Sequence, residues 1–176
     1  MELSTKKQIS VEAYIQNNYD KALLTQAVSV DFLAIPWLNW LQTWLTYLAD
    51  ELPQADSYEL SLRLVSDRQM QQINHRYRQQ NKPTDVLAFA ALETDIPKPK
   101  DANYLAEPLY LGDLIISLDT AAKQAQEQQH SLTTELAWLS SHGLLHLLGW
   151  DHVDESSLEA MLNLQAELLN TVDIVK

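Results

Sequence analysis

The chain contains no cysteine. This absence excludes a disulfide framework and any metal site built on thiolates. Long apolar runs are absent too: no stretch reaches the ~18 consecutive apolar residues of a membrane span, and the N-terminal residues lack the apolar core of a signal peptide. These absences together predict a cytoplasmic protein with no membrane-embedded segment.

Positive charge is scarce in this sequence. Lysine and arginine number 12 against 24 acidic residues, which gives a formal net charge of −12. Such a balance argues against a protein that coats nucleic acid in general. The basic residues are unevenly placed, however, and the stretch 63–82 holds a single acid, Asp67, beside Arg63, Arg68, Arg76, Arg78 and Lys82. This stretch could bind one phosphate-rich segment, or it could be a solvated helix face.

The length of 176 residues and the 46% of hydrophobic residues suit one domain with a sizeable core. Alternating or mostly apolar segments predict strands at 8–15, 58–65, 84–90 and 111–117. Helical periodicity and capping residues predict helices at 36–51, 67–77, 118–129, 132–148 and 156–170. The order of these elements predicts an α+β domain with a small mixed four-stranded sheet, covered by helices on at least one face.

Several details of this pattern can be checked. Trp37, Trp40 and Trp44 share one side of the first predicted helix, and we interpret this stripe as core rather than as a ligand-binding box. Ser156 and Glu159 have the spacing of a capping box at the start of the last helix. Residues 16–35 and 93–108 are expected to be irregular or exposed loop.

Three of the five histidines lie within eleven residues: His142, His146 and His152. His142 and His146 are four apart in an apolar run of helical period, so both imidazoles leave one face of a helix, one turn apart. Gly149 can end that helix in the left-handed conformation and turn the chain so that His152 returns towards the other two. Three converging neutral imidazoles predict a zinc site whose fourth position is open to water or substrate. The alternative is a closed structural site, but the sequence identifies no fourth protein ligand.

The same spacing matches the metallopeptidase motif H-E-x-x-H-x-x-G-x-x-H at every position but one. Gly143 stands where the peptidase has the glutamate that takes a proton from the zinc-bound water. Glycine cannot do this, which argues against peptide hydrolysis. A glycine inside a helix also costs about 1 kcal/mol relative to alanine. Its presence suggests that something approaches the helix backbone closely at this point.

The run H-G-L-L-H-L-L-G-W-D-H over 142–152 resembles the signature of the YbeY family, metal-dependent endoribonucleases of ribosomal RNA maturation. Three more segments resemble that family: Y-R…P-T-D-V-L at 77–87, L-G-D-L-I-I-S at 111–117, and H-S at 130–131. The resemblance runs from about Glu59 to Leu169, and 16–35 stands outside it as an unmatched insertion. The chain departs from the family's common aspartate, serine, proline and tyrosine at Asn81, Ala88, Ala90 and Trp150.

The resemblance implies a zincin-like fold in a single domain over 1–176, with one Zn²⁺ held by His142, His146 and His152. It implies a single-strand-specific endoribonuclease that acts in ribosomal RNA processing and ribosome quality control. It also implies that Arg78 lines the active cleft and is needed for activity. The implied partners are a ribosomal RNA precursor and the small ribosomal subunit or its proteins, whereas DNA and membranes are not expected as partners.

The residues alone leave three functions open: a zinc ribonuclease, a zinc peptidase, and a ribosome assembly factor whose metal is structural. They also leave the nucleophile open, because either a zinc-activated water or the 2′-hydroxyl of RNA could act without a protein base. Asp113 and Asp151 are candidates to orient a metal ligand through its second ring nitrogen. His75 and His130 are interpreted as structural or surface residues.

Overall fold

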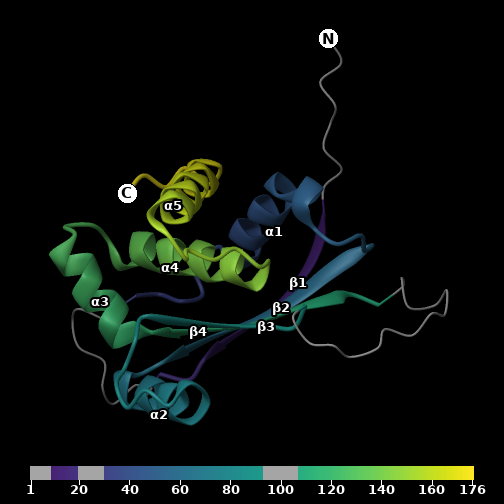
Figure 1. The fold of residues 1–176 in the computed structure, drawn as a ribbon. Coiled ribbons are helices and arrows are strands. Elements are labelled where there is room, and N and C mark those ends of the chain that lie inside the picture. The colour runs from purple at the N-terminus through teal and green to yellow at the C-terminus, as the bar shows by residue number, and fades with distance from the viewer. Residues whose placement is uncertain (1–8, 20–29, 93–106) are drawn as a thin grey trace.

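The computed structural model describes residues 9–19, 30–92 and 107–176 (Figure 1). The sequence-based expectations for 1–8, 20–29 and 93–106 lie outside the described residues. The strands are β1 (Ser10–Asn17), β2 (Ser57–Val65), β3 (Val86–Ala90) and β4 (Leu109–Ser117). The α-helices are α1 (Trp37–Tyr47), α2 (Asp67–Arg78), α3 (Leu118–Glu127), α4 (Leu132–Leu147) and α5 (Glu155–Asn170), with a short 3₁₀ turn, η3, at Ala49–Glu51.

The four strands form one mixed sheet in the order β1-β2-β4-β3. β1 and β4 both run parallel to β2, whereas β3 runs antiparallel to β4. β3 therefore lies at an edge of the sheet, next to the strand that leads into α3. The mixed four-stranded sheet of an α+β domain confirms the fold class predicted from the sequence.

Helices cover both faces of this sheet (Figure 1). Leu60, Leu62 and Leu64 of β2 belong to the large core that α1, α3, α4 and α5 complete. On the opposite face, Ile115 of β4 packs with Met70 of α2 in a smaller cluster. Successive residues of a strand point to opposite faces of the sheet, so the apolar residues of β4 pack in both the large core and the smaller cluster.

A bulge in β4 lies where β3 packs closely against that strand. Tyr110 pairs with Glu59 and Gly112 pairs with Leu60, so one extra residue lies between the two pairs. Gly112 has a φ of 136°, and a Cβ atom there would lie 2.1 Å from the carbonyl oxygen of Phe89 in β3. Glycine is needed here because it adopts this positive φ and because it has no side chain to collide with β3. β3 can therefore lie directly against β4.

The tryptophan stripe is core, as interpreted. Trp37, Trp40 and Trp44 are buried, and Trp44 has no exposed surface. The rings of Trp40 and Trp44 stack with centroids 6.0 Å apart. Trp44 also donates from Nε1 to the backbone oxygen of Leu168 at 2.8 Å, and this bond joins α1 to α5.

One predicted helix start is wrong. α5 is capped by Asp154, whose carboxylate accepts from the backbone N–H of Ser157 at 2.7 Å, while the Ser157 hydroxyl accepts from the N–H of Asp154 at 3.1 Å. The capping box therefore lies two residues before the predicted Ser156–Glu159 pair, because aspartate caps a helix as well as serine does. No helix in the described ranges is long and apolar enough to cross a membrane.

Candidate metal centre

The end of α4 has the geometry expected from Gly149. The N–H of Gly149 donates to the oxygen of His146, and the N–H of Trp150 donates to the oxygen of Leu145, at 3.1 and 3.0 Å. These two bonds form a Schellman motif, in which the residue after the helix is left-handed. Gly149 has a φ of 94°, so the chain reverses there and carries His152 back towards the helix.

His142, His146 and His152 converge as predicted. One ligand atom from each can be chosen so that all lie within 4.8 Å of one another. The ring centroid of His146 lies 4.7 Å from the ring centroid of His142 and 5.4 Å from that of His152. The Nε2 atoms of His142 and His146 are 3.1 Å apart. Nitrogens that share a tetrahedral zinc ion lie about 3.3 Å from each other, so this donor set fits such an ion.

A buried glutamine sets the orientation of His142. Gln165 of α5 has no exposed surface, and its Nε2 donates to the oxygen of Trp138 at 2.8 Å. This bond turns the amide oxygen of Gln165 towards His142 Nδ1, 3.3 Å away. The His142 Nδ1 must then carry the hydrogen, which leaves the lone pair of Nε2 free for a metal.

The environment favours the neutral form of two of the imidazoles. Burial lowers the pKa of His142 below its usual value, and the hydrogen bond to Gln165 offsets only part of this effect. Burial also lowers the pKa of His146, and the neighbouring His142 adds to the shift. A hydrogen bond to the Trp150 backbone acts in the opposite direction on His146. Neutral imidazoles are the form that binds metal, so both shifts favour metal binding.

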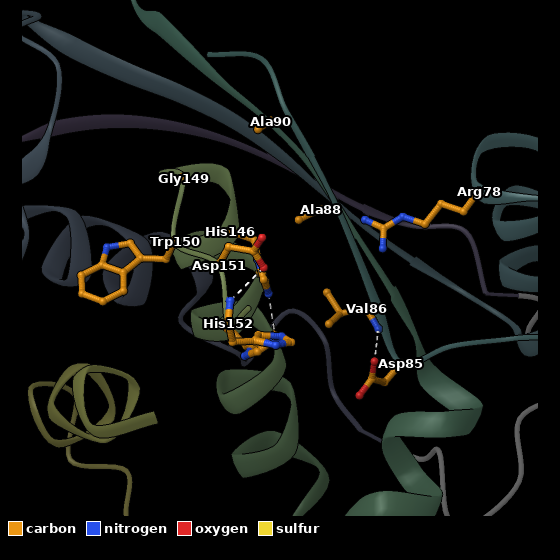
Figure 2. A pocket seen from close by; sticks show the side chains of 12 residues that line it. Arg78, Asp85, Val86, Ala88, Ala90, His146, Gly149, Trp150, Asp151 and His152 are labelled. Atoms are coloured by element: carbon orange, nitrogen blue, oxygen red, sulfur yellow. Dashed lines mark hydrogen bonds between the residues drawn. The ribbon is translucent and has the colours of Figure 1, made fainter. Parts of the chain in front are cut away.

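The histidines open into a cavity of about 520 Å³. Its wall comes from α2, β3 and the end of α4 (Figure 2). Arg78, at the last position of α2, lines the same cavity as the three histidines and is exposed. Asp85 and Asp151 are the carboxylates of the wall. The cavity thus holds a cation, two acids and three converging imidazoles.

The structure places the other sequence candidates in different roles. Asp151 holds the exit turn by accepting from the backbone N–H of His152 at 2.8 Å. Asp113 accepts from the hydroxyl of Ser61 in β2 and does not line the cavity. His130 pairs with the buried carboxylate of Glu135, and His75 is exposed on α2, which agrees with a structural and a surface role.

Gly143 is close to the sheet, which explains the glycine inside α4. A Cβ atom at this position would lie 2.7 Å from Leu114 Cδ2 in β4 and 3.2 Å from Val86 Cγ2 in β3. A neighbour does approach the helix backbone closely here, and it is the sheet, whereas the approach of a substrate at Gly143 stays a prediction. The missing side chain allows α4 to lie close enough to β3 for the histidines and Arg78 to share one cavity.

Comparison with known proteins identifies the family. The family model "Endoribonuclease YbeY" matches residues 25–173, which takes in part of the segment 16–35. The chain belongs to the YbeY endoribonuclease family. A relative named endoribonuclease YbeY from Trichormus variabilis is 52% identical over 163 residues, covering 93% of this chain and 92% of the relative. Another, from Synechocystis sp., is 50% identical over 164 residues, covering 93% and 91%.

The fold of this YbeY-family chain also resembles a solved structure. The solution structure of TM1509 from Thermotoga maritima aligns with a TM-score of 0.52 at 19% identity, over 92% of each chain. At that level of identity the likeness concerns the fold alone. It supports the same arrangement of sheet and helices in both proteins.

Two residues of this YbeY-family site were missed by the sequence analysis. Gln165 carries no motif, because it belongs to a helix that returns to α4 only in the folded chain. Asp85 lies within the quoted segment 77–87, yet its sequence position does not show that it lines the cavity. Its two oxygens accept from the N–H of Val86 and from Gln124 Nε2. Only the packing of α3 and α5 reveals these contacts.

Proposed function

We propose that the endoribonuclease activity of this chain depends on one zinc ion held by His142, His146 and His152, and that Arg78 binds the RNA phosphate at the site. The proposed substrate is single-stranded RNA, within ribosomal RNA processing and ribosome quality control in the cytoplasm. The small ribosomal subunit or its proteins are the proposed further partners. The observation that carries the proposal is the shared cavity of three converging imidazoles and an arginine.

The donor set suits zinc better than a hard cation. Imidazole nitrogens favour zinc and its transition-metal neighbours, whereas magnesium and calcium prefer oxygen ligands. His152 is exposed, so the cluster faces solvent rather than a closed interior. An open position of this kind is typical of a catalytic site. Zinc bound there would act as a Lewis acid towards a phosphoryl oxygen.

The residues of the chain supply binding and orientation. Arg78 has a planar guanidinium whose N–H groups fit two phosphate oxygens. Gln165 and the Trp150 backbone fix the rings of His142 and His146. Asp85 and Asp151 make the rest of the wall negative, so a phosphate is favoured only near the arginine and the metal.

The rival functions fit the site less well. A peptidase needs a carboxylate next to the first histidine, whereas this chain has Gly143 there, where even a Cβ atom would lie 2.7 Å from the Leu114 side chain. A purely structural metal needs a closed set of ligands, and the described residues offer three that face a cavity. Cleavage of labelled single-stranded RNA and of casein should be measured on one preparation with known zinc content. RNA cleavage without casein cleavage is expected, and casein cleavage alone would refute the proposal.

Arg78→Ala should lower RNA turnover by about 10²-fold while leaving the zinc content unchanged, because it removes a charged phosphate contact and no metal ligand. The salt dependence of RNA binding should also flatten by about 0.7 in logarithmic slope, the value for one single-strand phosphate contact. The control is Lys123→Ala, which removes an exposed cation from α3. Equal turnover in the two variants would show that Arg78 is only a surface residue.

Gln165→Leu should weaken zinc binding by about 10- to 100-fold, the usual effect of removing the hydrogen-bond partner of a metal-binding histidine. Leucine keeps a similar volume in this buried position but cannot accept from His142 Nδ1. Zinc affinity can be measured by competition with a chromophoric chelator, with a thermal melt to confirm the fold. An unchanged affinity in a folded variant would mean that Gln165 does not orient His142.

A further inference from the structure

The cavity passes around one edge of the sheet. α4, which carries His142 and His146, covers one face of the sheet, and α2, which ends at Arg78, covers the other (Figure 1). All three residues nevertheless line one cavity. A single cavity can reach both faces only around the edge strand, and on this side the edge strand is β3. Figure 2 shows Ala88 of β3 between Arg78 and His146.

The hydrogen bonds around β3 show which backbone groups the edge presents. Ser117 N–H donates to the oxygen of Asp85 at 2.9 Å, and Ala91 N–H donates to the oxygen of Leu111 at 3.0 Å. In an antiparallel pair, residues that bond to the partner strand alternate with residues that point away from it. Ala88, an odd number of positions from both Asp85 and Ala91, therefore directs its N–H and C=O away from β4. Within the described ranges, neither group has a partner among the backbone hydrogen bonds of turns, loops and caps.

We propose that the open edge of β3 is a binding subsite for the sugar–phosphate backbone of RNA, with the Ala88 N–H as a donor between Arg78 and the metal centre. This inference rests on the proposed function. Backbone N–H groups are common donors to phosphate oxygens and recognise them without regard to sequence. The adjacent C=O can accept from a ribose 2′-hydroxyl. The small side chain of Ala88 leaves the strand open to a nucleotide.

An extended polypeptide is the other occupant that an open strand edge can take. Charge favours RNA here, because Arg78 lies on one side of the edge and the proposed metal on the other, and a nucleic acid carries negative charge at every residue. β3 is also short, at five residues, and its Val86 N–H already donates to the Asp85 carboxylate at 2.7 Å. Few groups therefore remain for a strand-to-strand ladder.

Ala88→Pro tests this subsite because proline removes one N–H. Proline is tolerated in an edge strand where that N–H points away from the sheet. The KM for cleavage of a single-stranded RNA should rise by about tenfold, as expected for the loss of one hydrogen bond to a charged group. Zinc content should stay at the wild-type value, and the salt dependence of KM should not flatten, because the lost donor is uncharged.

The matched control is Ala13→Pro in β1, at the opposite edge of the same sheet. Asn18 N–H donates to Leu64 O in β2, so the N–H of Ala13, an odd number of residues away, points away from β2. A raised KM in Ala88→Pro together with a wild-type KM in Ala13→Pro supports the subsite. Wild-type KM in both variants overturns it.

A second measurement needs no variant and so does not depend on the fold of Ala88→Pro. In ¹⁵N-labelled wild-type protein, the Ala88 amide resonance should shift when single-stranded RNA is added. An Ala88 amide that is unmoved by RNA, or moved only by an extended peptide, overturns the subsite. A shift with RNA in a protein that cleaves no RNA would support the subsite and refute the proposed function, so the two failures are distinguishable.

Discussion

His146→Ala is expected to remove most of the zinc and to reduce RNA cleavage by about 10³-fold or more. His146 contributes the Nε2 that faces His142, and alanine leaves two imidazoles to hold the ion. Loss of the ion forfeits several kcal/mol of charge stabilisation in the transition state, and every 1.4 kcal/mol is a factor of ten in rate. Zinc content by elemental analysis and RNA turnover should be measured on the same sample.

The control for this variant is His75→Ala, which removes an exposed histidine of α2. It should keep about one zinc per chain and wild-type turnover. Both variants should be compared by thermal melting without metal, so that loss of zinc is not confused with loss of fold. Full zinc occupancy in His146→Ala would refute the site of three histidines.

Gly143→Glu is expected to abolish RNA cleavage without creating peptidase activity, although it completes the metallopeptidase motif. The sequence alone suggests that zinc stays bound in this variant, because no ligand changes. The structure adds a packing cost, since even a Cβ atom would lie 2.7 Å from Leu114 Cδ2 in the core. A carboxylate at this buried position adds a desolvation penalty, so we expect the free energy of unfolding to fall by about 3 kcal/mol or more.

Gly143→Ala separates the steric effect from the charge. Alanine favours the helix more than glycine does, but its Cβ atom still contacts Leu114. The free energy of unfolding of this variant should therefore change by only about 1 kcal/mol in either direction. Urea unfolding, zinc content, RNA cleavage and casein cleavage should be measured on both variants. A stable Gly143→Glu protein with wild-type RNA cleavage would contradict the close packing, and a clear gain of casein cleavage would reopen the peptidase interpretation.

The convergence of His142, His146 and His152 could be predicted from the sequence because the information for it is local. His142 and His146 are one turn apart on a helix, and Gly149 determines how that helix ends, so few geometries are open to His152. The strands and helices could be predicted for the same reason, because the alternation of a strand and the period of a helix are both visible within a single segment. The boundary of α5 was missed because Asp154 and Ser156 are both good caps, and local preference does not choose between them.

The remainder of the site depends on long-range packing. Gln165 reaches His142 across 23 residues of sequence, and no spacing rule connects them. Arg78 shares a cavity with the histidines because β3 lies antiparallel at the sheet edge, which its sequence does not specify. The glycine at position 143 indicates a close approach to the helix, yet the sequence does not show that Leu114 of β4 is the neighbour.

The most direct test of the account is a titration of zinc into metal-stripped protein while cleavage of single-stranded RNA is followed. If the three histidines hold the catalytic metal, RNA cleavage should be negligible without metal and should rise in proportion to added zinc. It should reach a plateau at about one equivalent of zinc per chain. Activity that is already complete in the stripped protein, or that stays absent after one equivalent has bound, would contradict the claim that these histidines hold the catalytic metal.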